Sequence, residues 1–463
     1  MVTRRRMLQA AASLPACGGI AGFANVIPAL TSAPIAGHFT HESVRLWLQA
    51  SVAVTATIVY WPENAKEENA RRIDLKLTDN NACAAIASMG GLAADSRYRF
   101  TVLLDDAPTG LMRSFRTSPA PGSVAADFRV YLGSCAYTEA MAPNGNPYGD
   151  EFHIFDAMAE AARTDRLPHF MLWLGDNLYF RPKGHFLAEA DVASVSRMET
   201  RYRHVRSLKL FQQLFAATHH YAIWDDHDFG PNDSDKSFKY KADALRLFKQ
   251  YWPNPEMGSS ALPGTWTKFT HQDAEFFLLD DRTYRDAENA PPSESKTMFG
   301  AAQIAWLKNS LKDSRATFKL IANGSQLLSD HDNGHHSGWH SYAAERNAFL
   351  AWLAAEKISG LVFLSGDRHN TQVFRLAQSG VPTVYEFSCS PLTSRLSKLD
   401  RRERANPRLV KELTVEKRNF GSLEFSGYGV ERKLIARCFD SNAKLLWEKL
   451  IASARFSGSG EPV

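Results

Sequence analysis

Cysteine is scarce in this sequence, which has five cysteines in 463 residues. They are spread too widely for the paired spacing of a zinc knuckle or for the framework of a disulfide-stapled domain. Free cysteines are usually buried as small apolar side chains, and we expect this of Cys83, Cys389 and Cys438. Cys135 differs from them because it directly follows a strand-like apolar run that ends in Gly-Ser.

The sequence also lacks a strong charge imbalance, internal repeats and low-complexity segments. Its formal net charge is +4, which leaves no polybasic footprint for binding nucleic acid. With 44% hydrophobic and 22% charged residues, the composition is that of a soluble globular protein. A chain of this length exceeds one ordinary hydrophobic core, so we expect two domains.

Acidic residues are absent from the first 33 positions, where Arg4, Arg5 and Arg6 precede a run rich in alanine and glycine. This order is typical of a secretion signal, and the run is weakly hydrophobic for a membrane anchor. The start TRRRML resembles a twin-arginine (Tat) signal, whose pathway carries folded proteins. We therefore expect a signal peptide over residues 1–33, Tat-dependent export to the periplasm or beyond, and no transmembrane segment after its removal.

Removal of this signal takes away three arginines and no acidic residue, so the net charge falls from +4 to +1. An alternative cleavage would leave a lipidated Cys17, because residues 14–17 loosely resemble a lipoprotein box. The mature protein is thus nearly neutral in either case.

Residues 34–121 consist of short β-rich pieces separated by polar or glycine-containing turns. They predict a small β-sandwich. The stretch GLAADSRYRFTV resembles the corner of immunoglobulin-like and fibronectin type III domains, in which a tyrosine starts a strand. A stiff linker rich in proline is expected at 117–122.

Residues 122–463 alternate strand-like runs with runs of helical spacing, at 151–164, 192–217, 240–252, 301–314 and 345–357. This alternation predicts a layered α/β domain with some hairpins, and one closing hairpin is expected across residues 440–442.

Four apolar runs in this domain end in glycine or aspartate and then in polar side chains, at 126–137, 169–179, 221–235 and 359–370. Continuous apolar runs indicate strands buried on both faces, and layered α/β folds place their sites at the carboxyl ends of such strands. The four loops should therefore meet in one crevice. They carry Cys135, Asp176, Tyr179, Asp226, His227, Asp367 and His369.

The motifs GSC, GDNLY, WDDHD followed by PND, and SGDRH, in this order behind a Tat-like leader and a β-sandwich, resemble PhoD-type alkaline phosphatases/phosphodiesterases of the metallophosphoesterase superfamily. The resemblance covers roughly residues 34–450. It implies a four-layer αββα catalytic domain. It also implies a site with one ferric iron and one or two calcium ions, in which other divalent metals are possible.

The resemblance also implies roles for single residues. Cys135 and Tyr179 would be thiolate and phenolate ligands of iron, Asp176 a bridging carboxylate, His369 an imidazole on the iron side, and Asp226 and Asp367 ligands of the second cation. His227 would lie beside the scissile phosphate with Asp228 orienting it, and Arg368 would neutralise developing charge. Thiolate, phenolate and imidazole do suit a transition metal, whereas carboxylates suit calcium or magnesium. Asn232 is a candidate for binding the substrate. In the NGSQ stretch, Asn323 or Gln326 could reach the substrate or the second metal, and Asn323 is the candidate that we name for the substrate.

The expected reaction is direct hydrolysis, in which a hydroxide held between the cations attacks phosphorus in line and His227 assists the leaving oxygen. No base is evident beside Ser134 that would make it a nucleophile. The histidines of loop 331–340 are expected at the surface or in a lid, or else behind the ligands. At His340 the family more often has an acidic residue.

The substrate stays open at this point among phosphate monoesters, phosphodiesters and phospholipid head groups, as in a phospholipase D-like hydrolase. A secreted binding protein with a degenerate metal site is the alternative from another class. We expect a monomer.

Overall fold

The computed structural model describes residues 26–140, 148–167, 169–180, 194–330 and 338–453. Most of the expected signal peptide lies outside these ranges, as do Cys17, His331, His335 and His336. No helix in the described part of the chain is long and apolar enough to cross a membrane.

Two six-stranded mixed sheets face each other in the C-terminal part of the chain. The first has the order β11 (His219–Ile223), β10 (His169–Leu174), β9 (Phe128–Gly133), β18 (Asn419–Ser426), β19 (Lys433–Asp440) and β20 (Leu445–Ser453). The second has the order β12 (Thr267–His271), β13 (Ala274–Leu278), β14 (Phe318–Ala322), β15 (Leu361–Ser365), β17 (Val381–Ser388) and β16 (Gln372–Gln378). Strands β9 to β11 run parallel, as do β13, β14, β15 and β17. The expected closing hairpin is β19 and β20.

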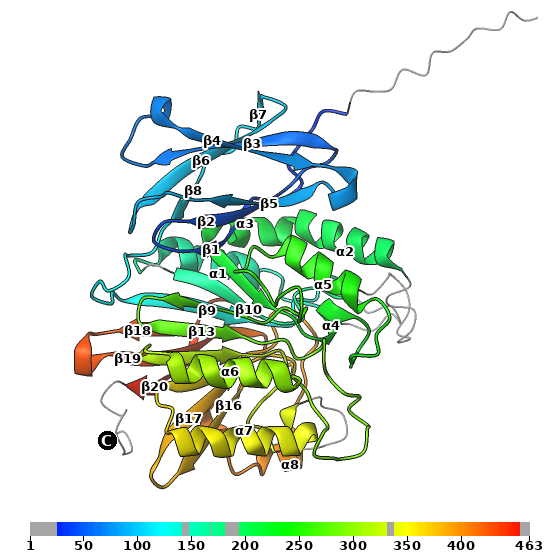
Figure 1. Ribbon diagram of the computed structural model, residues 1–463, viewed down its shortest axis with the longest axis vertical. Coiled ribbons are helices and arrows are strands. Elements are labelled where there is room, and N and C mark those ends of the chain that lie inside the picture. Colours follow the sequence, from blue (N-terminus) through cyan, green and yellow to red (C-terminus); the bar gives the residue numbers. More distant parts are fainter. Residues whose placement is uncertain (1–25, 141–147, 168, 181–193, 331–337, 454–463) are drawn as a thin grey trace, which may run out of the picture.

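Helices cover the outer face of each sheet (Figure 1). The first sheet packs against α1 (Ile154–Thr164), α2 (Val195–Ser207), α3 (Lys209–Ala217) and α5 (Lys241–Tyr251). The second packs against α6 (Ala301–Asp313) and α7 (Ala343–Glu356). Two one-turn helices, α4 (Asp226–Phe229) and α8 (Arg401–Arg404), lie in loops at the strand ends. The layers are thus helices, sheet, sheet and helices.

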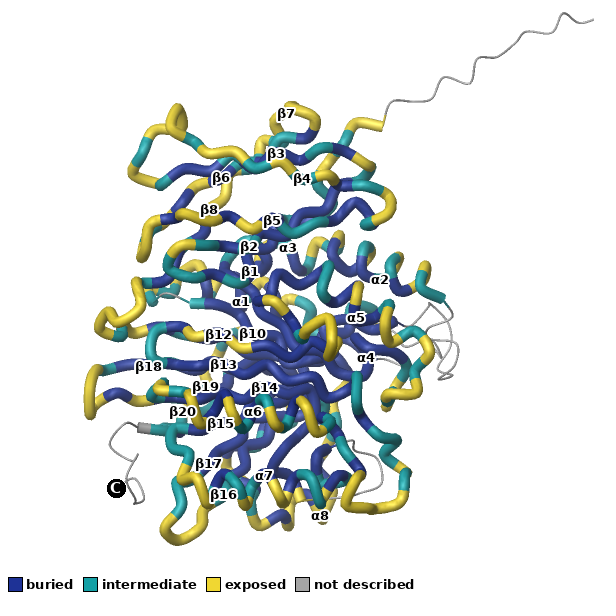
Figure 2. The backbone as a smooth tube through the Cα atoms, viewed as in Figure 1, coloured by how far each residue is buried: buried dark blue, intermediate teal, exposed yellow. Residues whose placement is uncertain are grey.

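Strand β10 shows why continuous apolar runs build this arrangement. Side chains alternate between the two faces of a strand. Phe170, Leu172 and Leu174 belong to the core between the sheets, whereas Met171 and Trp173 pack under the helices. Neither face of β10 meets solvent, so successive positions along the strand can all be apolar. Figure 2 shows the central strands as the most deeply buried part of the molecule.

The N-terminal part consists only of antiparallel strands, in two sheets. One has the order β1 (Ile35–Phe39), β2 (Val44–Gln49) and β5 (Ala84–Met89); the other has β4 (Arg71–Leu77), β3 (Val54–Pro62), β6 (Arg97–Leu104) and β7 (Ala107–Pro108), with β8 (Arg113–Arg116) paired to β6. The phenol oxygen of Tyr98 accepts a hydrogen bond from the Ala93 backbone N–H at 2.8 Å, which fixes the turn before β6.

The N-terminal sheets contact the C-terminal part of the chain away from the strand ends that carry the polar motifs. The Gly37 carbonyl oxygen accepts a hydrogen bond from Nδ1 of His219, the first residue of β11, at 2.8 Å. The Arg206 guanidinium of α2 lies 4.0 Å from the ring centre of Trp252 and 5.4 Å from that of Trp47. The carboxyl ends of β9, β10 and β11 are therefore left uncovered by this domain.

Two local expectations were wrong. The helical run 192–217 is broken at Leu208, which is extended (φ −65°, ψ 130°), and Gln212 Nε2 donates to the Leu208 carbonyl at 2.8 Å on the far side of the break. The start of the supposed linker is also not a free spacer. Thr117 and Ser118 are buried, and Ser118 Oγ lies 3.2 Å from His271 Nδ1.

Candidate metal and active site

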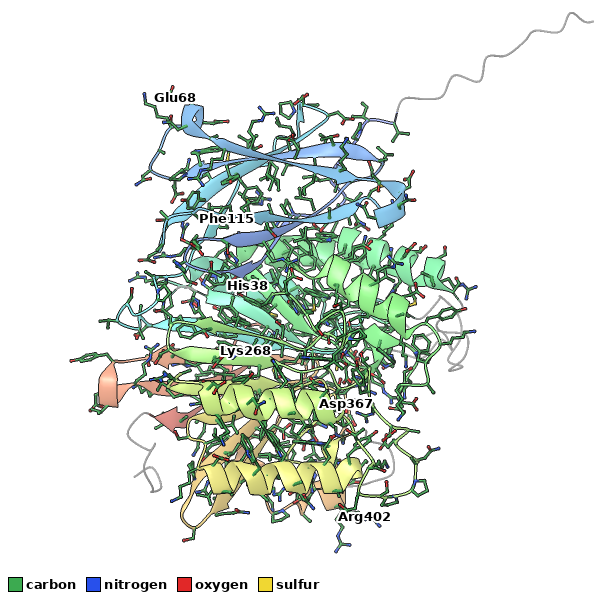
Figure 3. The ribbon with its side chains drawn as sticks, viewed as in Figure 1. His38, Glu68, Phe115, Lys268, Asp367 and Arg402 are labelled. Atoms are coloured by element: carbon green, nitrogen blue, oxygen red, sulfur yellow. The ribbon has the colours of Figure 1, made fainter. Side chains whose placement is uncertain are left out.

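The four motif-bearing loops meet at one edge of the two facing sheets. Three follow β9, β10 and β11 of the first sheet, and the fourth follows β15 of the second. The backbone N–H of Cys135 donates to the Gly175 carbonyl at 3.2 Å, which joins two loops of the first sheet. Cys135 Sγ lies 3.7 Å from the Asp367 carbonyl, which joins the two sheets. Figure 3 shows Asp367 on the same side of the molecule as α4.

The backbone is strained where the candidate ligands stand. Cys135, Asp176, Asp367 and His369 have φ angles of 58°, 52°, 68° and 55°. A residue with a side chain is uncommon in this left-handed region, and such strain, roughly 1–3 kcal/mol each, collects at functional sites. The sharp turn after each strand points these side chains at one another instead of into the sheet core.

Two glycines allow the strand ends to approach Asp225, a fully buried residue at the end of the first sheet. Gly175 has a φ of 90°, and a Cβ there would lie 2.7 Å from Asp225 Cβ; a Cβ at Gly324 would lie 2.6 Å from Asp225 Cγ. Gly324→Ala should therefore destabilise the protein by about 1–3 kcal/mol through overpacking. The midpoint of denaturant unfolding measures this. Gly90→Ala is the control, because a Cβ at Gly90 meets nothing within 4 Å; equal unfolding midpoints for the two variants would contradict the prediction.

The first group of candidate ligands is Cys135, Asp176 and His369, whose ligand atoms all lie within 4.8 Å of one another. Cys135 Sγ is 3.6 Å from Asp176 Oδ2, and the Tyr179 hydroxyl donates to the same oxygen at 3.1 Å. Thiol, phenol, carboxyl and imidazole thus surround one point. All of these side chains except that of His369 are buried.

The second group is Asp176, Asp226 and His227, again with ligand atoms within 4.8 Å of one another. The His227 backbone N–H donates to Asp176 Oδ1 at 3.3 Å and to Asp226 Oδ1 at 3.0 Å. Asp176 belongs to both groups, so its two oxygens can face two ions at once. His227 offers an imidazole nitrogen as a possible ligand here, a placement that sequence reasoning did not foresee.

The electrostatics of these groups fit a cation. Burial and the Asp176 carboxylate raise the pKa of the Cys135 thiol and of the Tyr179 phenol well above their usual values. Burial and the carboxylate of Asp226 likewise raise the pKa of Asp176. Acidic groups this close oppose one another's ionisation, and a bound metal ion reverses that effect. Thiolate, phenolate, carboxylate and imidazole are all ligands of transition metals.

Asp228 is fully buried beside this edge, and its contacts hold the turn. Asp228 Oδ1 accepts from the backbone N–H and the side-chain amide of Asn177, each at 3.1 Å, and Oδ2 accepts from the Asp225 N–H at 3.0 Å. Burial raises the pKa of Asp228 to about 7 in spite of these bonds. Its role in orienting His227 stays a prediction.

The loop after β15 places Asp367, Arg368 and His369 at the same edge. Burial raises the pKa of Asp367 to about 6, opposed by the Arg368 charge. His369 keeps part of its surface exposed, but its ring lies among protein atoms, and this desolvation together with the Arg395 charge lowers the pKa of the imidazole to about 3. The imidazole is therefore neutral and able to bind a metal. Within the described part of the chain, Asp367 is in neither ligand group, and Arg368 forms a buried ion pair with Glu403 of α8.

The two candidate amides lie in different surroundings. Asn232 is exposed and donates to Asp233 Oδ2 at 2.5 Å. Asn323 follows β14, is fully buried, and donates through Nδ2 to the Ser325 carbonyl at 2.7 Å. Among the described atoms its Oδ1 is buried without a hydrogen-bond partner. A buried acceptor of this kind calls for a cation or a donor, so Asn323 fits the site better than Asn232 does.

Sequence reasoning missed the side chains that support the first group. Ser390 Oγ donates to Cys135 Sγ at 3.2 Å, and Ser394 Oγ lies 2.9 Å from the Tyr179 hydroxyl. Both belong to the loop after β17, in the stretch CSPLTS at residues 389–394, which the sequence analysis did not single out. The signal that could have identified them is the same as for the other loops, namely polar residues directly after a buried strand.

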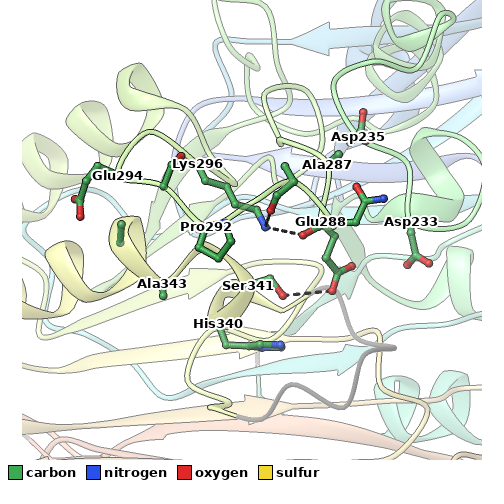
Figure 4. Close-up of a pocket in the computed structure, with 14 residues that line it drawn as sticks. Asp233, Asp235, Ala287, Glu288, Pro292, Glu294, Lys296, His340, Ser341 and Ala343 are labelled. Atoms are coloured by element: carbon green, nitrogen blue, oxygen red, sulfur yellow. Dashed lines mark hydrogen bonds between the residues drawn. The ribbon is translucent and has the colours of Figure 1, made fainter.

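A cavity of about 960 Å³ has Asp233 and His340 in its wall (Figure 4). Asp233 lines it and also donates its backbone N–H to Asp226 Oδ2 at 2.7 Å, so the cavity begins next to a candidate ligand. Acidic side chains dominate the charge of its walls, which include Asp235, Glu288, Glu294, Lys296 and His340. His340 thus faces the cavity and is in neither ligand group among the described residues.

Two facing mixed sheets gather thiol, carboxylate and imidazole groups where their strands end, an arrangement that suits a metal-dependent enzyme. A family model for PhoD-like phosphatases matches residues 128–432. The chain therefore belongs to the PhoD-like phosphatase family.

Solved structures share the fold. A structure of PhoD is 18% identical, with 91% of this chain and 92% of that one covered, at a TM-score of 0.71. The purple acid phosphatase PPD1 from seeds of yellow lupin (Lupinus luteus) is 9% identical, with 91% and 74% covered, at a TM-score of 0.64. Comparison with curated proteins gave no match.

Proposed function

We propose that the protein is an exported, metal-dependent alkaline phosphatase or phosphodiesterase whose active site is the edge where the four loops meet. The observation that carries this proposal is the pair of ligand groups that share Asp176. A carboxylate shared by two metal ions would hold both ions close to the phosphoryl group. Two ions in this position can stabilise the attacking oxygen and the leaving oxygen of the hydrolysis.

Iron is the metal that we propose for the side of Cys135, Tyr179 and His369, because thiolate, phenolate and neutral imidazole favour a transition metal. Calcium is proposed for the side of Asp226, where carboxylate oxygens and the buried Asn323 Oδ1 offer hard ligands. Asp367 would complete this side. Bound ions would polarise the phosphoryl group and lower the pKa of a water molecule.

The residues of the chain then have separate tasks. Asp176 holds both sides together, and its Oδ1 also fixes the His227 backbone. The His227 ring, 4.2 Å from that of Tyr179, would protonate or hydrogen-bond the leaving oxygen. Arg368 forms a buried ion pair with Glu403. Its guanidinium would therefore have to contact Glu403 and the phosphate at the same time in order to stabilise charge on the phosphate. The cavity beside Asp233 gives room for the alcohol part of the ester.

Hydrolysis of a panel of phosphate monoesters, phosphodiesters and phospholipids, with metal analysis of the same preparation, tests the proposal. We expect iron and calcium and activity that chelators abolish. A phospholipase D-like head-group hydrolase would show itself by preference for the lipid substrates. A protein without metal or activity would instead support a secreted binding protein with a degenerate site.

Cys135→Ala should lower iron content and activity together, by about tenfold or more, because it removes a ligand from the iron side. Metal analysis and kcat/KM on one preparation measure both effects. Cys438→Ala and Cys83→Ala are matched controls, since both thiols are buried and neither belongs to a candidate ligand group among the described residues. Loss of iron in a control, or its retention in Cys135→Ala, would contradict the assignment.

Further parts of the proposal concern the rest of the chain. We propose that residues 34–121 form an immunoglobulin-like or fibronectin-like domain, which the bond from the Ala93 N–H to the Tyr98 hydroxyl supports as a tyrosine corner. Residues 122–463 would be the catalytic domain. Export by the Tat route through residues 1–33, and a monomeric state, are proposed as well. Fractionation of cells that carry Arg5→Lys and Arg6→Lys tests the export route.

A further inference from the structure

A buried arginine beneath the candidate metal groups has no place in the scheme given so far. Arg282 follows β13 in the stretch LLDDR, and its side chain is completely buried. Burying a guanidinium is costly unless carboxylates and other acceptors surround it. Arg282 has such partners: Nε donates to Asp225 Oδ1 at 2.8 Å, Nη2 also donates to that oxygen, and Asp281 Oδ1 lies 3.7 Å from Nε.

The contacts of Arg282 reach three loops of the site. Asp225 directly precedes the candidate ligand Asp226, after β11. Nη1 donates to the Ser234 carbonyl at 3.2 Å, in the loop that follows α4. Nη2 donates to Ser325 Oγ at 3.2 Å, two residues after Asn323 at the end of β14. The planar guanidinium of Arg282 thus joins loops that follow strands of both sheets.

These contacts hold Asp226 from both sides along the chain. Arg282 fixes Asp225 on one side and Ser234 on the other, and the N–H of the intervening Asp233 donates to Asp226 Oδ2 at 2.7 Å. The Ser325 backbone N–H donates to Asp281 Oδ2 at 3.1 Å, which ties the Asn323 loop to the same anchor. Asp226 and Asn323, which are proposed as oxygen ligands of the second cation, are therefore both positioned by the guanidinium of Arg282.

Charge supports the same interpretation. Burial would lower the pKa of Arg282, but Asp225 and Asp281 hold it well above the usual value, so the group is always cationic. A buried cation is thus fixed between the loop that carries Asp226 and the loop that carries Asn323.

We infer that Arg282 is a positioning residue that sets the affinity of the site for the cation on the Asp226 side, without touching the substrate. The inference rests on the proposed function. Removing residues that orient ligands usually lowers metal affinity by about 10- to 100-fold. Arg282→Met keeps a long side chain of similar volume but removes the guanidinium and its hydrogen bonds. It should lower the affinity for the cation on the Asp226 side by about 10- to 100-fold.

The variant Arg282→Lys separates the effect of the guanidinium geometry from the effect of its positive charge. Arg282→Lys keeps the positive charge, but an ammonium cannot donate to Asp225, Ser234 and Ser325 from one plane. We expect Arg282→Lys to lose affinity by at least about tenfold as well. This variant retains the charge that the buried carboxylates need, so it also serves if Arg282→Met does not fold.

The experiment is a calorimetric titration of Ca²⁺ and of Mn²⁺ into the full chain after a chelator has removed exchangeable cations. Arg432→Met is the matched control. Arg432 is also buried and ion-paired, with Asp273 at 2.8 Å and Asp127 at 3.2 Å, but at the opposite end of β13. It should lower the unfolding temperature and leave cation affinity within about twofold of wild type.

Unchanged affinity in Arg282→Met, full recovery in Arg282→Lys, or an equal loss in Arg432→Met would overturn the positioning role while leaving the proposed function intact. A wild-type protein that binds neither ion would contradict the proposed function and this inference together.

Discussion

Asp176→Asn is expected to lower kcat/KM by on the order of 10⁴-fold and to lower the content of both metals. Asp176 is the one residue common to the two ligand groups. It also accepts from the Tyr179 hydroxyl and from the His227 backbone. An amide has one neutral acceptor oxygen in place of two anionic ones, so it cannot serve both ions. Metal analysis and steady-state kinetics on the same preparation measure the result.

The control for this variant is Asp165→Asn. Asp165 is a buried carboxylate that accepts from Arg129 at 2.7 Å and from Tyr131 at 2.9 Å, near the opposite end of the first sheet. Its replacement should lower stability without changing metal content. If Asp176→Asn keeps both metals in full, the bridging role is wrong even where activity is lost.

His227→Asn should lower turnover by about 10²–10⁴-fold while the metals are retained, the range usual for a positioned acid or base. His227 is buried at 6% exposure, with its backbone held by Asp176 and Asp226, so the substitution removes the ring without moving the loop. A group that assists the leaving oxygen matters less when the leaving group is already good. The loss should therefore be smaller for nitrophenyl esters than for alkyl esters.

The structure gives this experiment a second possible result, because His227 also stands within reach of a shared ion with Asp176 and Asp226. Loss of metal from His227→Asn, with equal losses on nitrophenyl and alkyl esters, would show that the ring is a ligand and not an acid. His220→Asn is the matched control, since His220 is a fully buried imidazole bonded to Trp173 Nε1 at 3.0 Å.

The fold was predictable where one physical signal dominated. The apolar runs at 169–179 and 359–370 contain the strands His169–Leu174 and Leu361–Ser365, and both faces of each strand are covered. Short apolar runs that end at glycine favour strands of this kind. Strand β12 and the edge strand β1 were not foreseen, since short segments with polar residues carry little periodicity. The break at Leu208 lies within a continuous helical pattern, and the spacing of apolar residues does not reveal the local hydrogen bond from the Gln212 side chain to the Leu208 carbonyl.

The site was predictable to the level of which residues meet. Residues such as Cys135 and Asp176 directly follow buried strands, so parallel topology alone brings them to one edge. Their left-handed backbone, the support from Ser390 and the anchoring by Arg282 were not predictable, because each depends on contacts between segments far apart in the sequence. His227 shows the remaining limit. The sequence analysis assigned it only the role of assisting the leaving oxygen, whereas the geometry also permits it to be a metal ligand.

The division of the candidate ligands between two sheets has a consequence for how the protein is held together. Cys135, Asp176 and Asp226 follow strands of one sheet, whereas Asp367 and His369 follow β15 of the other. An ion shared across this edge would act as a clasp between the two halves of the sandwich. Its binding free energy would then be part of the free energy of folding. Chelation should open the molecule first at this edge, and the amide hydrogens of the strand ends should exchange with solvent before those of the strand centres.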